Sequence, residues 1–550
     1  MVRILFSTPY IPYPKARLFE DNIDFFYYRN TLRQGIFQLR QNQSWHPLHF
    51  LAQNLPVASL VLENPTLNGF KKELMRHHYD VVALTFSIIT TSRILEMATW
   101  VKKISPGTEV IIGGYGTAVF SEPCEITEQL RNTVDHICTG EGVAFLSDYL
   151  KEKFGIIISR PLEQNLLPIR VSFFRTRFPI NMNLNFIAAL GCNFHCSFCS
   201  TSSQFKQKKV LFSGENLFRS VKQGAERYPR ATSGVIFEED FLENREAVLE
   251  FMHCMEKDTA LITRPFYLTV FSSAHNVVRY TMSELIRCGI GMLYIGVESF
   301  DDDLLETEKL KKRGGSQVDI EQLFGQLHAA GIHTLGSIII GWDKHTNQSI
   351  PLELDRFVKL NPTLYQVMPL QAVPGTPLWQ RMKEEGRINP DFSFDKARLE
   401  KSSFRFKNIT QEESMNYILH TYQKLVDEGG PWPFRMLENM YNGIGSLEKE
   451  EGYEFRNRVN GYKKLLLPTY VLSCICGLLF YGHGFRKRWR RLMGKMFLER
   501  PLWSILGWIM AIFALPVLSG YILLGSLRHF ILPAGDQPET IRMEYKNPLW

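Results

Sequence analysis

GCNFHCSFC, residues 191–199, is the stretch that decides the fold of this chain, and it follows an apolar run at residues 186–190. Its three thiols, Cys192, Cys196 and Cys199, stand four and three residues apart in a glycine-led turn. Cysteine thiolate is the usual protein ligand of iron–sulfur clusters, and three thiolates leave one iron of a four-iron cluster open to a small molecule. Three unrelated buried thiols are the alternative. The loop position and the aromatic Phe198 before the last cysteine favour a cluster.

The spacing C-x3-C-x-aromatic-C resembles the signature of the radical S-adenosylmethionine (SAM) enzymes. The resemblance implies a [4Fe-4S] cluster on the three cysteines, with SAM chelated at the open iron and Phe198 on the SAM side. In that family, one-electron reduction splits SAM to a 5′-deoxyadenosyl radical, which abstracts hydrogen from unactivated carbon. A reducing electron donor such as a flavodoxin or ferredoxin is therefore an implied partner. The protein itself would place the reactive atom against the substrate and exclude competing reactions.

Length and composition bound the number of domains and the compartment. A chain of 550 residues exceeds one hydrophobic core, so roughly two to four domains are expected. The net charge of +7 is modest and clusters at residues 486–491, which favours a membrane surface over a nucleic-acid partner. The nine cysteines are odd in number and mostly scattered, and residues 1–14 reach prolines before a secretory apolar core could form. We therefore expect the catalytic part on the cytoplasmic side of a membrane.

Residues 1–150 alternate short apolar runs with helix-like stretches, which predicts a doubly wound parallel sheet. The expected strands are residues 2–6, 59–62, 81–86, 110–112 and 137–138. Ligands bind such sheets beyond the carboxyl ends of the strands, where small residues let a large planar ligand approach the backbone. The small residues that fall there are Thr8, Ser87, Gly113, Gly114, Gly140 and Gly142. Ordinary turns that need a positive φ are the alternative explanation for the glycines.

In front of a radical SAM core, this region resembles the cobalamin-binding domain of the cobalamin-dependent radical SAM enzymes. The resemblance implies cobalamin as a further cofactor, held at the six small residues just named. The D-x-H-x-x-G motif that supplies a histidine ligand is absent from residues 1–150, and Asp343-Lys344-His345 is a distant partial match without the glycine. In this radical SAM class the histidine is often missing. A domain that has lost its cobalamin is the alternative.

Residues 151–180 are expected to form a connector, and residues 181–388 repeat strands and helices. This alternation predicts a parallel α/β barrel with its chemistry at the carboxyl ends of the strands. The radical SAM resemblance implies a partial barrel of roughly six βα units over this stretch. The expected strands are residues 186–190, 235–237, 267–271, 293–297, 334–340 and 365–368. Residues 374–378 and 385–387 resemble the P-G-T-P-L…E-G-R closing segment of cobalamin-type members, to which we assign no catalytic role.

Polar residues and a glycine follow three strands of the expected barrel. Glu238 and Glu239 lie where the family holds the SAM ammonium group, and a carboxylate suits a cation. The sequence does not choose between these two acids. Glu298 and Ser299 end a strand in a pattern that resembles the family's G-x-E-S and would face SAM or substrate, while Gly341 resembles the glycine that packs under adenine. For each acid, a solvated loop carboxylate is the alternative.

The C-terminal third changes character. Residues 389–460 are polar and helical, and they would form either a cover over the barrel mouth or a structural collar. Within 461–550, the runs 465–485 and 502–527 have no charged residue with histidine neutral, so each is long enough to cross a bilayer. A buried helix pair is the alternative. Because a crossing by 465–485 would put the arginines of 486–491 on the outer side, we favour a monotopic or re-entrant hairpin.

Together these patterns predict a membrane-associated, cobalamin-dependent radical SAM enzyme that methylates an unactivated carbon. Its substrate would be lipid-like or otherwise hydrophobic, because a membrane-bound barrel can receive a substrate that never enters water. Two alternatives stay open. One is a radical SAM enzyme that uses cobalamin in ring formation, oxidation or carbon–carbon coupling without methylating. The other is a membrane-bound cobalamin or redox sensor whose cluster does not turn over.

Overall fold

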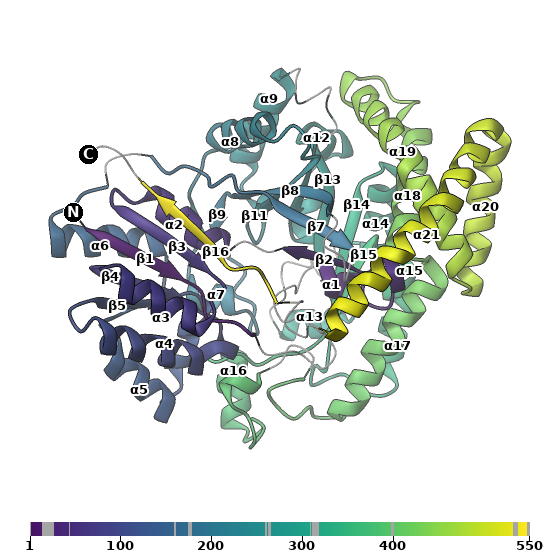
Figure 1. Ribbon diagram of the computed structural model, residues 1–550. Coiled ribbons are helices and arrows are strands. Elements are labelled where there is room, and N and C mark those ends of the chain that lie inside the picture. The colour runs from purple at the N-terminus through teal and green to yellow at the C-terminus, as the bar shows by residue number, and fades with distance from the viewer. Residues whose placement is uncertain are drawn as a thin grey trace.

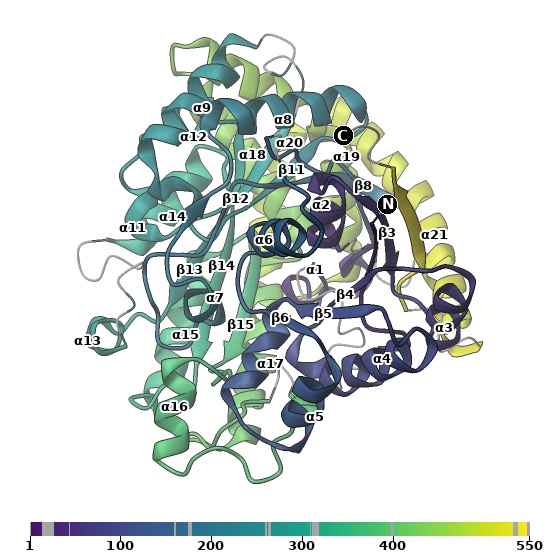
Figure 2. The same ribbon diagram turned by 90° about the vertical axis from the view of Figure 1, so that its left-hand side faces the viewer.

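The structure, a computed structural model, describes residues 2–13, 27–42, 45–158, 161–173, 179–258, 261, 264, 266–308, 310, 318–397, 401–531 and 537–546. Its described strands form two large sheets with helices packed around them (Figure 1). The N-terminal sheet and its helices, purple and blue, lie beside the teal and green middle region (Figures 1 and 2). The α/β class expected from the alternation of strands and helices is confirmed.

The N-terminal sheet is doubly wound, as expected. Its parallel strands run in the order β3 (Ala58–Glu63), β1 (Arg3–Ser7), β4 (Val81–Thr85), β5 (Glu109–Gly113) and β6 (His136–Cys138). Its helices are α2 (His46–Asn54), α3 (Leu67–Arg76), α4 (Thr91–Ile104), α5 (Glu125–Thr133) and α6 (Gly142–Phe154). Because neighbouring side chains alternate across a strand, Phe6 packs into one core with α2 and α6, while Leu5 packs into another with α3 and α4. Chain order reverses between β1 and β4, where such sheets open a crevice.

The second sheet contains the parallel strands expected for a partial barrel. They run in the order β8 (Pro179–Ile187), β11 (Ser233–Phe237), β12 (Tyr267–Phe271), β13 (Ile290–Glu298), β14 (His333–Ile340) and β15 (Leu364–Pro369). The main helices between these strands are α8 (Gly214–Arg227), α9 (Arg245–Lys257), α12 (Met282–Arg287), α14 (Ile320–Ala329) and α15 (Ser349–Leu360). Each strand end that carries a predicted site residue therefore lies on one edge of this sheet.

Two antiparallel strands extend the barrel sheet beyond β8. They are β7 (Ile169–Phe173), which falls in the expected connector, and β2 (Leu39–Asn42), which falls in the expected N-terminal domain. The short helix α1 (Tyr27–Asn30), just before β2, reaches the opposite edge of the sheet at β15. There Gln34 Nε2 donates to the Tyr365 hydroxyl at 3.0 Å, and Arg29 lies 3.2 Å from the Met368 sulfur. Residues 27–42 thus bridge the two edges of the open barrel.

The helices after β15 make up the C-terminal part of the chain. They are α16 (Pro377–Glu384), α17 (Gln411–Gly429), α18 (Trp432–Leu447), α19 (Tyr453–Leu479), α20 (His483–Glu499) and α21 (Pro501–Ile531). Tyr462 of α19 donates to the Gly331 carbonyl at 2.6 Å, just before β14, and Arg458 donates to the Ile290 carbonyl at 2.8 Å, where β13 begins. Buried Arg435 of α18 donates to the Pro362 carbonyl at 2.6 Å, just before β15. These bonds tie α18 and α19 to the starts of the barrel strands.

The two apolar runs near the C-terminus have different environments. Both α19 and α21 are long and apolar enough to cross a membrane, but 50% of the apolar window of α19 is buried in the protein against 11% of that of α21. The expected run 465–485 is therefore partly core, and its helix ends at Leu479. After α21, strand β16 (Ile541–Tyr545) pairs antiparallel with β3. Figure 1 shows this yellow strand beside the purple N-terminal strands. The sequence patterns did not predict this return.

Candidate functional site

The three thiols lie in one tight loop at the carboxyl end of the first barrel strand, between β9 (Ala189–Leu190) and α7 (Ser200–Gln204). Gly191 opens the loop with φ of +83°, and a Cβ there would lie 2.6 Å from the Gln207 carbonyl oxygen, so only glycine fits. The Cys199 N–H donates to the Cys196 carbonyl at 3.1 Å, and the Cys199 carbonyl accepts from the Ser203 N–H as α7 begins. Cys196 is buried, while Cys192 and Cys199 are half-buried.

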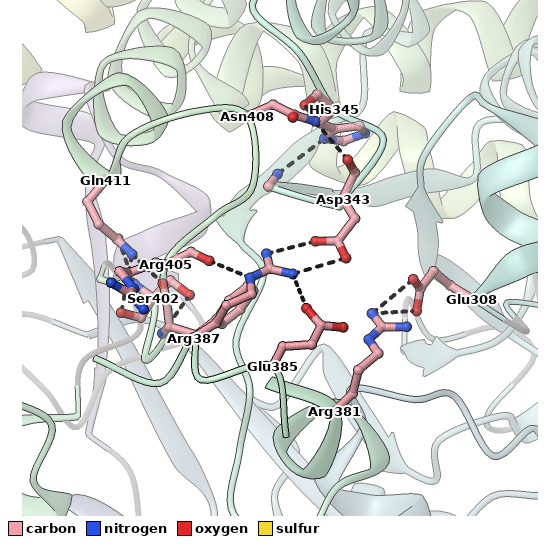
Figure 3. Close-up of polar contacts among 12 residues, drawn as sticks. Glu308, Asp343, His345, Arg381, Glu385, Arg387, Ser402, Arg405, Asn408 and Gln411 are labelled. Carbon is pink, nitrogen blue, oxygen red and sulfur yellow. Dashed lines mark hydrogen bonds and ion pairs between the residues drawn. The ribbon is translucent and has the colours of Figure 1, made fainter. Parts of the chain in front are cut away.

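Contacts from the far side of the barrel hold this loop in place. The Ser197 carbonyl accepts from the Leu378 N–H at 2.9 Å, and the Ser197 hydroxyl donates to Glu308 at 3.1 Å. Glu308 also accepts from Arg381 of α16 at 3.0 Å, as Figure 3 shows. Phe198 sets its ring edge against Trp342, with the ring centroids 5.7 Å apart. Sequence reasoning missed Glu308 and Arg381 because neither belongs to a local motif.

The donor set of the loop fits an iron–sulfur cluster. Among the described residues, no group of three or more His, Cys, Asp or Glu side chains surrounds a single-ion position. A four-iron cluster does not need such a position, because its cysteines ligate different irons. Three cysteines within one loop, with one thiol buried and two half-exposed, match that chemistry in residue type and access.

The acids after β11 are not equivalent. The side chain of Glu238 is buried against Lys208 Nζ, and Lys208 also contacts Glu243 at 3.0 Å. Burial raises the pKa of Glu238 to about 7, although the neighbouring Lys208 opposes that rise. Buried Asp240 accepts from the Ser272 hydroxyl at 2.6 Å and from Asn276 at 2.9 Å. Both acids are therefore engaged with partners inside the fold.

Glu239 lies between these two acids, and its side chain is exposed. Protein atoms around the carboxyl nevertheless keep part of the solvent away from it and raise its pKa, and a hydrogen bond from Thr201 of α7 acts against that rise. The Thr201 hydroxyl in turn lies 3.1 Å from the hydroxyl of Tyr115, in the short helix Tyr115–Ser121 of the N-terminal domain. Glu239 therefore stands where the thiol loop, the barrel and the N-terminal domain meet.

The strand end that carries Glu298 and Ser299 turns into a buried polar network. Glu298 is buried with φ of +59°, and the buried Ser299 hydroxyl donates to Glu353 of α15 at 2.6 Å. His345 Nε2 lies 3.1 Å from the other Glu353 oxygen, and His345 Nδ1 accepts from the Gly341 N–H at 3.1 Å. The network therefore joins the ends of β13 and β14. It directs the Ser299 hydroxyl toward α15.

Gly341 and the segment after α16 form a cover over the end of β14. Gly341 has φ of +95°, and a Cβ there would lie 2.4 Å from the ring of Phe406. Arg387 donates to both oxygens of Asp343, at 2.8 and 3.1 Å, and to Glu385 at 2.8 Å (Figure 3). These bonds hold the described residues 388–397 and 401–406 across the strand end. The E-G-R part of the closing segment therefore has an anchoring role.

A cavity of about 310 Å³ opens at the carboxyl edge of the N-terminal sheet. Five of the six small residues singled out in this region line it, namely Ser87, Gly113, Gly114, Gly140 and Gly142. A Cβ at Gly140 would meet nothing within 4 Å, so the backbone there is open to a ligand. Thr8 is not among the described residues that line the cavity. Its buried hydroxyl oxygen accepts from the Asn64 N–H at 2.7 Å.

Two polar atoms in the wall of this glycine-lined cavity are buried without a partner among the described residues. They are the donor Trp45 Nε1 and the acceptor Gln204 Oε1. Gln204 Nε2 donates to the Gly114 carbonyl at 3.4 Å. This bond fixes the side chain while Oε1 has no hydrogen-bond donor among the described residues. An unpaired buried polar atom costs free energy unless a ligand or water satisfies it. An apolar cavity with one donor and one acceptor suits a large, mostly apolar ligand that carries amide or hydroxyl groups.

A second cavity of about 310 Å³ shares the wall formed by Ser87 and Tyr115 with the first. Its other walls come from Ser200 of α7, from the chain after β15 and from the cover at residues 388–397 and 401–406. Ile88, Ile89 and Phe392 make much of this lining apolar. Helix α7 therefore touches both cavities, through Ser200 and Gln204, directly after the last thiol.

Comparison with known families identifies the middle of the chain. Residues 187–356 match the radical SAM superfamily. Hopanoid C-2 methylase of Rhodopseudomonas palustris (strain TIE-1) is 25% identical over 205 residues, which are 36% of this chain and 38% of that protein. Bacteriochlorophyllide d C-12(1)-methyltransferase of Chlorobaculum tepidum is 22% identical over 387 residues, which are 68% of this chain and 77% of that protein.

The similarity to curated relatives is partial in length. The chain spans 38% of the hopanoid methylase and 45% of a second relative, an uncharacterized methyltransferase of Synechocystis sp.. Among solved structures, the radical S-adenosylmethionine methyltransferase TsrM from Kitasatospora setae, with cobalamin and a [4Fe-4S] cluster bound, has a TM-score of 0.53 and 13% identity. That match covers 85% of this chain and 99% of the other. It shows that the two proteins share a fold.

Proposed function

Because residues 187–356 of this chain are a radical SAM domain, we propose that the protein is a cobalamin-dependent radical SAM methyltransferase acting on an unactivated carbon of a hydrophobic substrate. One observation carries this proposal. Helix α7 follows directly after Cys199 and lines both the glycine-lined cavity and the apolar cavity beside it. A cluster on the thiols, a methyl carrier in the first cavity and a substrate in the second would therefore meet at one helix.

The barrel edge would hold the cluster and SAM. Cys192, Cys196 and Cys199 would ligate three irons. The hydrogen bond from Ser197 to Glu308 would hold the loop in the position that this ligation needs. Glu239 is the better candidate for the SAM ammonium group, because Glu238 is already paired with Lys208. Gly341 and Glu298 remain candidates for the SAM side, whereas the Ser299 hydroxyl is committed to Glu353.

The glycine-lined cavity would hold cobalamin. Its apolar walls and open backbone at Gly140 suit a large ligand, and Trp45 Nε1 and Gln204 Oε1 offer it a donor and an acceptor. When bound, the reduced cluster with SAM supplies a hydrogen-abstracting radical, and cobalamin supplies a transferable methyl group. This chain would place the two sites on either side of Ser87 and Tyr115. It would exclude water with the cover at residues 388–397 and 401–406.

The second cavity would hold the reacting part of the substrate. Its apolar lining favours a lipid-like portion of the substrate. The charged residues in its wall, Asp391 and Lys401, are 3.6 Å apart and exposed, so they face each other at the rim. The names of the hopanoid and bacteriochlorophyllide enzymes, whose substrates are hydrophobic, support the same substrate class.

Methyl transfer can be tested with the reconstituted protein. The full chain is loaded anaerobically with iron, sulfide and cobalamin, reduced, and supplied with methyl-labelled SAM and a hydrophobic extract of its source cells. The proposal predicts label in a product that partitions into organic solvent, together with 5′-deoxyadenosine. Deoxyadenosine without labelled product would favour the non-methylating enzyme. Bound cobalamin with no SAM cleavage would favour the sensor.

A further inference from the structure

Helix α21 makes its closest contacts with the protein through small residues. Trp503 and Trp508 also pack inward, while most of its large aliphatic residues face outward. Ser504, Gly507 and Ala511 are buried, and a Cβ at Gly507 would lie 2.5 Å from the ring of Tyr470 on α19. Leu502 is 83% exposed and Phe513 is 73% exposed. A soluble amphipathic helix has the opposite arrangement, with large apolar residues toward the core. Small residues at the protein contact and large apolar residues facing out are typical of helices in lipid.

We define the outer face of α21 by its exposed large apolar side chains, Leu502, Ile505, Ile512, Phe513, Val517 and Leu524. Figures 1 and 2 both show this yellow helix on the outside of the molecule. A soluble monomer rarely exposes so long an apolar stripe, which normally marks an interaction surface. The helix α19 gives the contrast within the same chain, because half of its apolar window is buried in the protein.

Helix α20, which precedes α21 and packs on it, carries a basic ridge of exposed side chains, Lys487, Arg490, Arg491 and Lys495. Arg488, in the same run, is instead bound to Glu438 and to Asn361, so it belongs to the fold. Exposed cations beside an apolar face match a bilayer that has anionic headgroups over its hydrocarbon. A second copy of this chain would bring the same basic ridge and would be repelled at that edge.

The chain after α21 returns to the N-terminal sheet, where β16 pairs with β3 and side-chain contacts hold it. We call these contacts the latch. Arg542 of β16 donates to both oxygens of Glu73, each at 3.1 Å. Burial alone would raise the pKa of Glu73, but its hydrogen bonds with Arg542 and Tyr79 lower it overall. The Tyr545 hydroxyl contacts His49 at 2.7 Å and Asn165 at 3.0 Å. Both ends of α21 are therefore joined to one globular body.

This latch excludes a membrane crossing by α21. The helix has 31 residues, which span about 46 Å at 1.5 Å per residue. A crossing would place one end beyond a hydrocarbon core about 30 Å thick. Residues 532–536 are all that joins α21 to the described residue Gln537. Fully extended, that link reaches about 22 Å, which does not return β16 across the bilayer to β3.

We infer that α21 is an in-plane membrane helix. Its outer face lies in one leaflet of an anionic bilayer, the basic ridge of α20 contacts the headgroups, and β16 stays paired with β3 on the same side. The protein is then monotopic. This membrane contact is independent of the reaction proposed above, and it adds the partner surface and the orientation of the chain upon it.

Vesicle binding tests the surface. The loaded full chain is mixed with vesicles of phosphatidylcholine alone or of phosphatidylcholine with phosphatidylglycerol, and bound protein is measured by flotation. Phe513→Glu/Leu524→Glu should lower binding to the anionic vesicles at least tenfold, and Arg490→Gln/Arg491→Gln should lower it only where phosphatidylglycerol is present. Leu352→Glu, at a 68% exposed leucine of α15, is the matched control and should bind as wild type.

Hydrogen exchange on the vesicle-bound protein tests the orientation. Amides of residues 541–545 should keep their protection on binding, because β16 remains on β3. Loss of that protection would overturn the in-plane arrangement. The membrane contact would be overturned if wild type bound neither kind of vesicle. It would also be overturned if wild type sedimented as a dimer and Phe513→Glu/Leu524→Glu sedimented as a monomer. A loss of 5′-deoxyadenosine formation without a change in vesicle binding would bear on the proposed reaction alone.

Discussion

The two strand edges on either side of α7 offer opposite chemistry. The edge of the N-terminal sheet presents glycine backbone and apolar walls around a cavity of about 310 Å³. The edge of the barrel presents thiols and carboxylates, and Glu238, Asp240 and Glu308 already have partners within the fold. In the proposed function, the first edge would recognise its ligand by shape, and the second would do so by charge and coordination. Changes of volume and changes of charge should therefore act on different cofactors.

The largest expected effect comes from removing the coordinating atoms of the barrel edge. Cys192→Ala/Cys196→Ala/Cys199→Ala should abolish the iron–sulfur signal and SAM cleavage, because the cluster loses its thiolates. Cobalamin binding should survive. The measurement is anaerobic reconstitution followed by optical and paramagnetic spectra, with Cys254→Ala on α9 as the control thiol. A four-iron signal that persists in the triple variant would contradict the assignment.

Filling the N-terminal edge should affect cobalamin and spare the cluster. A Cβ at Gly140 meets nothing within 4 Å, so Gly140→Val should fold normally and intrude into the cavity. Overfilling a site costs about 1–3 kcal/mol, which would lower cobalamin affinity by about 5-fold to about 150-fold. Cobalamin binding by difference spectroscopy measures this. Gly107→Val is the matched control, because a Cβ there also meets nothing within 4 Å. Equal cobalamin affinity in Gly140→Val and Gly107→Val would show that cobalamin does not bind in this cavity.

The two neighbouring acids should respond differently to loss of charge. Glu239→Gln should weaken SAM binding about tenfold, because a charge-assisted hydrogen bond contributes about 1.5–3 kcal/mol. Glu238→Gln should leave SAM binding nearly unchanged, since that carboxyl already faces Lys208. Calorimetric titration of the cluster-loaded protein with SAM measures both. The reverse ranking would assign the ammonium contact to Glu238.

Glu238 should give the barrel edge a pH-dependent stability. Burial raises its pKa to about 7 from an ordinary 4.5, even with Lys208 beside it. A carboxyl whose pKa is higher in the folded state stabilises the fold at low pH and loses that contribution as pH rises through the folded pKa. The free energy of unfolding should therefore fall between about pH 4.5 and about pH 7 in wild type, by a share that Glu238→Gln lacks. Thermal unfolding of both proteins across this pH range measures this share. Identical pH profiles for wild type and Glu238→Gln would show that Glu238 does not contribute to it.

The smallest effect is expected at Ser299. Ser299→Ala removes the hydrogen bond to Glu353 and should lower the free energy of unfolding by about 1–2 kcal/mol. SAM affinity should change less than twofold, because that hydroxyl faces α15 rather than a cavity. Thermal unfolding and SAM titration are compared. A tenfold loss of SAM affinity at unchanged stability would restore the expected contact between Ser299 and SAM.

Features that depend on neighbouring residues were readable from the sequence alone. The thiol loop follows from a spacing of three cysteines, and the parallel strands of both sheets follow from apolar runs set between helices. Hydrophobic periodicity and turn residues act over a few positions, so a sequence shows them directly. Five of the six small residues chosen for the N-terminal edge do line one cavity for the same reason, because parallel strands end at one edge.

Only the tertiary structure decided which of these residues are free to act. Lys208 contacts Glu238 from another element, and Glu353 of α15 likewise contacts Ser299. No local sequence pattern predicts either pair. Strand β16 pairs with β3 although the two are far apart in the chain, and this pairing is the basis of our inference that α21 lies in the plane of a membrane. Hydropathy treats α19 and α21 alike, whereas packing buries half of one window and leaves the other outside. Sequence therefore determined the elements and the coordinating atoms, and long-range contacts determined their partners, because burial and pairing depend on residues that meet only in the fold.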